Sequence, residues 1–201
     1  MTDLVSTYSQ RFDTVLVPLA NSIEHHLIDL FEDIDRIDRI TARPKSIDKF
    51  IAKAAKLDGS QPKYSEPIHQ IQDQIGARII TFYKSDVERI SEIAKKYLRF
   101  VENKDIVPES PWEFGYFGKH FVVLVPPELK SPSFDESMTP LFFELQIKTL
   151  FEHAWSEANH DLGYKPETEL DKHAKRRLAF TSAQAWGADQ VFDELHREGS
   201  N

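Results

Sequence analysis

The sequence predicts an α/β domain in which one β-sheet is flanked by helices. Apolar, β-branched and aromatic runs at Ala77–Phe82, His120–Val125 and Leu141–Ile147 are typical of buried strands. Before, between and after them, apolar residues recur at the three-and-four spacing of amphipathic helices. With 201 residues, of which 40% are hydrophobic, the chain can bury one sizeable core.

The termini are predicted to be long helices around that core. Residues 1–201 are expected to form a single domain, with a core over about 40–165 and helical extensions over 1–40 and 166–201. One helix is predicted from about residue 12 to 40, and the last from about Thr168 to Leu195. The first prediction rests on an apolar stripe of Leu27, Leu30, Phe31, Ile34 and Ile37.

The segment that follows is predicted to contain a short basic helix and then the first strand. A helix is expected from Ser46 to Leu57, and residues 58–66, rich in turn-forming residues, are expected to form a mobile connection. The strand is Ala77–Phe82. Ser85 stands three residues before Glu88 in the capping-box pattern, which predicts a helix to about residue 100.

The second half of the sheet is predicted from two runs and a loop. Val101–Ile106 is expected to be a short strand and His120–Val125 a strong one. The Pro- and Ser-rich stretch from Pro126 to Pro140 is expected to be a surface loop.

Polar residues interrupt the last apolar strand in a pattern typical of a site. Glu144 and Gln146 are one pleat apart and share a face of the strand. Thr149 precedes Glu152 by three residues, so a capped helix is predicted to begin at Leu150. Four titratable residues follow at helical spacing and are expected to share one face of that helix. They are His153, Glu157, His160 and Asp161.

Composition excludes several classes of site. The chain has no cysteine, so it can hold neither a disulfide, a thiol nucleophile nor a thiolate metal site. No apolar run approaches the roughly 20 residues of a membrane span, and no leader pattern is visible, so a cytoplasmic protein without membrane contact is expected. The net charge of −8 disfavours a general grip on nucleic acid. Local basic clusters lie at Arg39–Lys56 and Lys172–Arg177, and the second is most simply a solvated helix face.

Two acidic residues are candidates for a metal site. Asp73 and Glu144 each stand beside a strong strand. Two carboxylates brought together at strand edges can hold Mg²⁺ and leave positions for phosphate oxygens. Taken singly, each is equally well explained as a helix cap or a surface ion pair.

A second candidate site is cationic. Lys45 and Ser46 lie at a predicted helix start, where free N–H groups favour anions, and Lys53 lies two turns further on. Together with Arg43 they could cradle a triphosphate, and a guanidinium such as that of Arg43 or Arg78 can stack on a purine. An ordinary basic helix face would show the same pattern.

A glycine-punctuated aromatic loop is the third candidate. Phe114 to His120 carries an aromatic residue on either side of Gly115 and opens into a strand. An exposed ring on such a loop suits base stacking, whereas aromatic residues before a strand are more often core.

In combination these residues resemble the synthetase domain of the RelA/SpoT homologue family, whose members make the alarmones ppGpp and pppGpp. The resemblance covers about residues 40–165, and the flanking helices are similar to those of single-domain small alarmone synthetases. Its motifs are Arg43-Pro-Lys45-Ser46 with Phe50 and Lys53, Asp73-x-x-Gly76-x-Arg78, Tyr116 with His120, and Glu144-x-Gln146-Ile-Lys148-Thr149 followed by His153-Ala-Trp155 and His160 to Lys165.

The resemblance implies a nucleotidyltransferase-like mixed sheet and an ATP-dependent pyrophosphotransferase. The β,γ-pyrophosphate of ATP would move to the ribose 3′-hydroxyl of GDP or GTP, releasing AMP, with Mg²⁺ as the cofactor. Asp73 and Glu144 would bind the metal, and Glu144 would also draw the acceptor's proton. The other implied contacts are to ATP by Arg43, Lys45, Ser46, Lys53 and Arg78, and to the acceptor by Tyr116, His120 and Gln146.

Departures from the family pattern keep other functions open. Lys49, Gly118 and Lys148 replace residues usual in the family, and the stretch from Asp105 to Phe114 contains no basic residue where lysines usually hold the acceptor's 5′ phosphates. A toxin that pyrophosphorylates the 3′ end of tRNA needs no such lysines, and would have an antitoxin partner. A catalytically silent nucleotide-binding module is the third possibility. The sequence leaves a homo-oligomer open.

Overall fold

The computed structural model describes residues 2–106, 113–115, 118–163 and 170–199. Its centre is a five-stranded mixed sheet in the order β1-β4-β7-β6-β5. The β4–β7 pair is parallel, and the other neighbours are antiparallel. The strands are β1 (Ile37–Pro44), β4 (Ile75–Thr81), β5 (Phe100–Ile106), β6 (Gly118–Leu124) and β7 (Phe142–Thr149).

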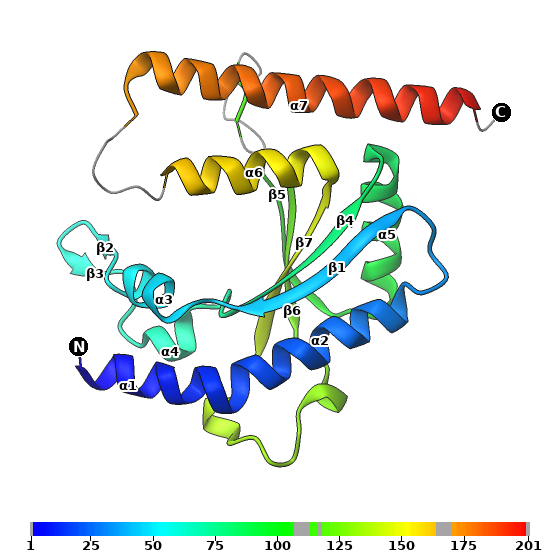
Figure 1. Ribbon diagram of the computed structural model, residues 1–201. Helices are drawn as coiled ribbons and strands as arrows, with labels where there is room; N and C mark the ends of the chain where they lie inside the picture. The colour runs from blue at the N-terminus through cyan, green and yellow to red at the C-terminus, as the bar shows by residue number, and fades with distance from the viewer. Residues whose placement is uncertain (1, 107–112, 116–117, 164–169, 200–201) are drawn as a thin grey trace.

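Helices cover both faces of the sheet. Figure 1 shows α1 and α2 along one side and α6 and α7 stacked on the other. The helices are α1 (Thr2–Arg11), which continues through a π-helical turn at Phe12–Leu16 into α2 (Val17–Leu30), then α3 (Ile47–Ala54), α4 (Pro67–Gln70), α5 (Lys84–Tyr97), α6 (Leu150–Gly163) and α7 (Lys172–Gly199). No helix in these described ranges has both the length and the apolar character needed to cross a bilayer.

The hydrophobic core lies on the face covered by α2 and α5. Ile23 of α2, Ile90 of α5 and the strand residues Ile79, Leu145 and Ile147 are all fully buried. Because side chains alternate along a strand, the residues between these face the opposite side of the sheet. The strands β4 and β7, predicted as apolar runs, thus have one face buried in the hydrophobic core and one face that carries polar residues.

Strand register gathers the polar residues into rows. Arg78 pairs with Gln146, which pairs with His120, so these three side chains lie side by side across β4, β7 and β6. In the next row Gly76 of β4 lies between Arg43 of β1 and Glu144 of β7. Since Gly76 has no side chain, the space between Arg43 and Glu144 is left open.

The predicted helix from residue 12 to 40 is wrong at both ends. Helix begins at Thr2 and ends at Leu30, and residues 37–44 form the edge strand β1. The apolar spacing was misleading because Ile34 and Ile37 do pack on the core, although from a turn and a strand. Arg36, with φ of 68°, makes the reversal between them.

Apart from α4, which was not predicted, the other elements agree with the predictions to within a few residues, with three differences of detail. The connection at 58–66 includes a hairpin of β2 (Leu57–Asp58) and β3 (Gln61–Pro62). The expected cap by Ser85 is not formed: its N–H donates to Asp193 of α7, while Glu88 forms an ion pair with Lys119. Two short 3₁₀ turns, Pro127–Leu129 and Glu136–Met138, lie in the loop before β7.

Candidate active site

One pocket of about 270 Å³ opens on the polar face of the sheet, where β1 ends and β4 and β7 begin. It gathers most of the residues predicted from the sequence, although they are spread over three separate segments. Those that line it are Arg43, Lys45, Ser46, Asp73, Arg78, Glu144 and Gln146. Lys53 and His120 reach the same site through contacts with Asp73 and Glu144. Tyr116 lies outside the described residues.

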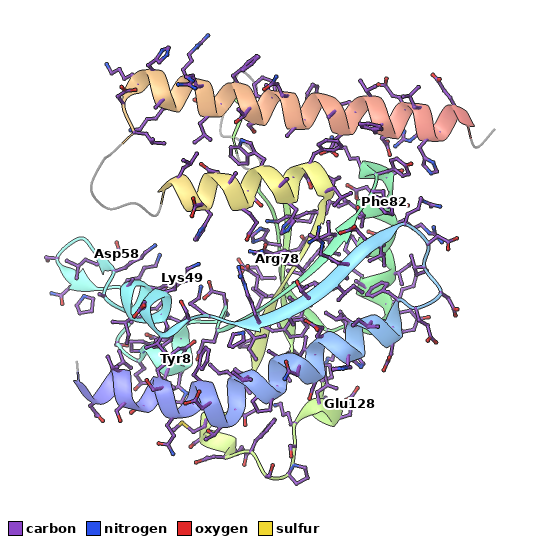
Figure 2. All side chains as sticks on the ribbon, viewed as in Figure 1. Tyr8, Lys49, Asp58, Arg78, Phe82 and Glu128 are labelled. Carbon is purple, nitrogen blue, oxygen red and sulfur yellow. The ribbon has the colours of Figure 1, made fainter. Side chains whose placement is uncertain are left out.

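A pair of lysines flanks Asp73 at one side of the pocket. Lys53 Nζ donates to Asp73 Oδ2 at 2.7 Å, and Lys45 Nζ lies 3.0 Å from the same oxygen. Lys45 stands just before α3, so its position depends on how that helix is anchored. The Tyr8 hydroxyl donates to the Lys45 carbonyl at 2.8 Å, and the Tyr8 ring stacks on Phe50 of α3 at 3.7 Å. Figure 2 places Tyr8 at this junction of α1 and α3.

Oxygen atoms in the pocket fit a hard cation. Asp73 Oδ1 and Gln146 Oε1 are buried and have no hydrogen-bond donor among the described residues. Glu144, which lines the same pocket, is a carboxylate whose pKa is lowered. Carboxylate and amide oxygens are the ligands that Mg²⁺ prefers, so this set fits the predicted metal. The described residues contain no cluster of three or more acidic or histidine side chains with metal-site geometry, so these two carboxylates would leave most coordination positions to substrate or water.

Glu144 is held ionised by its neighbours. Gln146 Nε2 donates to Glu144 Oε1, and His120 Nδ1 lies 3.5 Å from Oε2. Burial raises the pKa of this carboxyl, but hydrogen bonding and charge from His120, the Gln146 amide and the charge of Lys45 together outweigh burial and lower its pKa to about 2. At neutral pH Glu144 is therefore a carboxylate suited to binding a cation or a hydroxyl proton.

Glu157 of α6 joins two arginines across the mouth of the pocket. Arg78 Nη1 donates to Glu157 Oε1 at 2.7 Å, and Arg43 Nη2 lies 3.9 Å from Oε2. In Figure 2 Arg78 lies between the sheet and α6. The guanidinium faces of two arginines from neighbouring strands are thus presented to one space.

Five residues that line this pocket had no role predicted from the sequence. They are Pro44, Lys49, Gly76, Glu157 and His160. Glu157 and His160 had been placed on one face of α6 by their spacing, which was the signal that could have identified them. Gly76 had appeared only as part of a motif, and its contribution to the space beside Glu144 follows from strand register.

Lys148, one of the three departures from the family pattern, packs beneath α6 and does not line this pocket. It is 2% exposed, and its Nζ lies 3.4 Å from Ser156 Oγ. Burial, followed by the charge of Arg78, lowers its pKa to about 8. The helix above it begins with the predicted capping box: Glu152 N–H donates to Thr149 Oγ1 at 3.1 Å, and Thr149 N–H donates to Glu152 Oε2 at 3.0 Å.

A family model and two curated relatives place the chain in the same protein family. The family described as "Region found in RelA / SpoT proteins" matches residues 42–169. The GTP pyrophosphokinase YjbM of Bacillus subtilis is 28% identical over 203 residues, covering 94% of this chain and 90% of the relative. YwaC, a GTP pyrophosphokinase of the same organism, is 26% identical over 164 residues, covering 81% and 75%.

Solved structures agree in fold and extent. The small alarmone synthetase 1 of Bacillus subtilis has a TM-score of 0.74 at 27% identity, covering 91% of this chain and 94% of that one. The same enzyme bound to its product pppGpp has a TM-score of 0.71 at 28% identity, with coverage of 89% and 91%. The mixed sheet with helices on both faces and long terminal helices is shared with these structures.

Proposed function

The chain belongs to the RelA/SpoT family, and from this premise we propose that it transfers the β,γ-pyrophosphate of ATP to the ribose 3′-hydroxyl of GDP or GTP, forming ppGpp or pppGpp and releasing AMP. The observation that carries the proposal is the single pocket that joins Asp73 and Glu144 to the cations Arg43, Lys45 and Arg78. The relatives that cover most of the chain are named GTP pyrophosphokinases, which supports the same activity. Both substrates are abundant in the cytoplasm, where we propose that it acts.

The cations of the pocket are suited to ATP. Lys45 and Lys53 bring positive charge to one side, beside the first turn of α3, where unpaired N–H groups favour phosphate oxygens. The flat guanidinium groups of Arg43 and Arg78 offer faces on which adenine can stack. When bound by Asp73 and Glu144, Mg²⁺ would offset negative charge on the phosphates.

The reaction needs a hydroxyl oriented toward the β-phosphorus of ATP. Glu144 accepts a hydrogen bond from the acceptor's 3′-hydroxyl and takes its proton as the new oxygen–phosphorus bond forms. The bond from the β-phosphorus to the oxygen shared with the α-phosphate breaks, and AMP leaves with that oxygen. A carboxylate with a pKa of about 2 is a weak base, so proton transfer accompanies bond formation and does not precede it.

The test is a transfer assay with separate acceptors. Purified protein is incubated with γ-labelled ATP, Mg²⁺ and either GDP, GTP or bulk tRNA, and the products are separated by chromatography. Label in a guanosine tetra- or pentaphosphate supports the proposal, and label only in RNA contradicts it. Label in none of the acceptors would indicate a nucleotide-binding module without catalysis, although the presence of both Asp73 and Glu144 in the pocket argues against that outcome.

One sequence feature favours a second candidate function. The stretch from Asp105 to Phe114 has no basic residue for the 5′ phosphates of a free nucleotide. A toxin that pyrophosphorylates the terminal adenosine of tRNA would not need one, and would be accompanied by a neutralising antitoxin. The net charge of −8 weighs against this alternative because RNA binding depends on phosphate neutralisation.

A further inference from the structure

A second, larger cavity has a lining different from that of the pocket that holds Asp73 and Glu144. It measures about 790 Å³ and lies between the segment Glu113–Gly115 and the first half of α7. None of its lining residues lines the first pocket. Its size is that of a nucleotide or a large part of one.

The cavity combines cations with exposed aromatic rings. Arg176 and Arg177 of α7 line it, and no ion pair within the described parts of the chain engages either guanidinium. Phe114 and Phe180 line it as well, with 38% and 63% of their surface exposed. Glu113 contributes one opposing carboxylate, so the charged side chains of the lining sum to a positive value.

This wall of the cavity is fixed to α7. Ser182, which is 2% exposed, donates from Oγ to the Gly115 carbonyl at 2.7 Å. The Phe114 ring meets Trp186 edge-on with 5.9 Å between ring centroids. Helix α7 therefore sets the position of the residues that lead directly into Tyr116, which the family resemblance assigns to the acceptor base.

We propose that Arg176 and Arg177 hold the 5′ phosphates of the acceptor nucleotide. The inference rests on the proposed function and names the part of the chain that determines acceptor choice. The sequence between Asp105 and Phe114 has no positive charge. Helix α7, about 60 residues later, supplies that charge because it packs against the end of this stretch. The exposed rings then cover the apolar side of the same ligand.

The test compares acceptors that differ only in their 5′ phosphates. With the Arg176→Gln/Arg177→Gln variant, the KM for GTP should rise about tenfold, that for GDP less, and that for guanosine not at all. The KM for ATP and kcat with saturating acceptor should stay unchanged. The matched control is Lys172→Gln/Lys175→Gln, which removes the same charge from the same helix outside the cavity and should leave every KM unchanged.

A second variant acts in the opposite direction. Glu113→Gln removes the one carboxylate of the cavity and should lower the KM for GTP about threefold, because like-charge repulsion with phosphate is lost. A loss of folding cannot produce a gain in affinity, so this variant keeps the test decisive if the arginine variant is unstable. Calorimetric binding of GTP and guanosine without ATP gives a readout independent of turnover.

The outcomes separate the inference from the proposed function. If the unmodified protein makes guanosine products but the arginine variant raises the KM for guanosine and GTP alike, or for neither, the inference is wrong and the function stands. If the unmodified protein transfers label only to RNA or to nothing, the proposed function fails first. A KM effect that grows with the number of 5′ phosphates supports both.

Discussion

Lys53 Nζ donates a hydrogen bond to Asp73 Oδ2 at 2.7 Å, whereas the other carboxylate oxygen, Asp73 Oδ1, is buried and accepts no hydrogen bond from the described residues. A buried carboxylate oxygen without a donor is costly in a stable fold. Asp73 itself lines the pocket that also contains Glu144. The relationship explains why a lysine and a carboxylate can meet in a site without cancelling each other, since one oxygen is held and the other remains available to a cation.

Asp73→Asn is therefore expected to weaken metal use before it weakens folding. The amide cannot supply a charged oxygen to Mg²⁺, and Lys45 and Lys53 lose their common partner. Transfer should fall about 100-fold or more at 1 mM Mg²⁺ and recover partly at higher Mg²⁺. A Mg²⁺ titration of the rate measures this, with Mn²⁺ binding by spin resonance as the readout without turnover. Asp58→Asn, on the β2–β3 hairpin, is the control. An unchanged Mg²⁺ dependence would remove Asp73 from the metal site.

Glu144→Gln should abolish transfer and leave ATP binding nearly intact. Loss of the carboxylate removes both the cation ligand and the acceptor of the hydroxyl proton, so kcat should fall about 1000-fold or more. ATP affinity, measured by calorimetry, should change less than about threefold because Arg43, Lys45 and Arg78 remain. Glu128→Gln, in the loop before β7, serves as the control. A variant with near-normal turnover would refute the assigned role.

The pH dependence of the same step follows from the low pKa of Glu144. Because that pKa is about 2, the carboxylate stays ionised as pH falls from 9 to 5. The rate of the unmodified protein should accordingly show no loss centred near pH 4.5, the ordinary value for a glutamate. A rate profile between pH 4 and 9 at saturating substrates checks this.

Glu157 is expected to position Arg78 for ATP. Glu157→Ala should raise the KM for ATP about tenfold with little change in kcat, because Arg78 and Arg43 lose the partner that holds them across the pocket mouth. Glu157→Gln should recover most of this affinity, since the amide oxygen still accepts from Arg78. Equal losses in the two variants would indicate that charge, and not orientation, is what Glu157 supplies.

Much of the fold was predictable because its main elements carry strong local patterns. β4 and β7 are apolar runs, and the cap at Thr149 and Glu152 forms as its spacing predicts. β1 was missed because it is an edge strand whose inward residues, beginning with Ile37, continue the helical spacing of the preceding segment. Local pattern cannot distinguish a helix from a turn and a strand that pack on one core.

The site was predictable where residues of one motif act together, and less so where distant segments meet. Asp73 and Glu144, which lie 71 positions apart in the sequence, both line the same pocket, and their pairing around a metal ion stays a prediction. Glu157 lacked an assigned partner because its ion pair with Arg78 spans 79 positions. Arg176 and Arg177 looked like a solvated face, and only the packing of α7 against Glu113–Gly115 gives them a cavity.

Asp189 makes the stability of the fold depend on pH near neutrality. Its carboxylate lies between α7 and the start of α6, 4% exposed, where Oδ2 accepts from Thr149 Oγ1 at 2.8 Å. Burial raises its pKa from 3.8 to about 7; the Thr149 hydrogen bond and Lys84 lower it, and the nearby carboxylates of Glu152 and Asp193 raise it further. The folded chain thus binds this proton more tightly than the unfolded chain does.

The unfolding free energy should therefore fall as pH rises from about 4 to 7, by up to about 4 kcal/mol, and change little through Asp189 above that range. Asp189→Asn keeps an acceptor for Thr149 without the charge, so its urea unfolding measured between pH 5 and 8.5 should lose most of this slope. Asp193→Asn, one turn further along α7, should keep the slope, because the pKa of Asp193 is lowered: burial opposes its ionisation, but hydrogen bonds from Ser85 outweigh it. A slope of equal size in the unmodified protein and in Asp189→Asn would show that another group titrates there, and the contact between α7 and α6 would then be insensitive to pH.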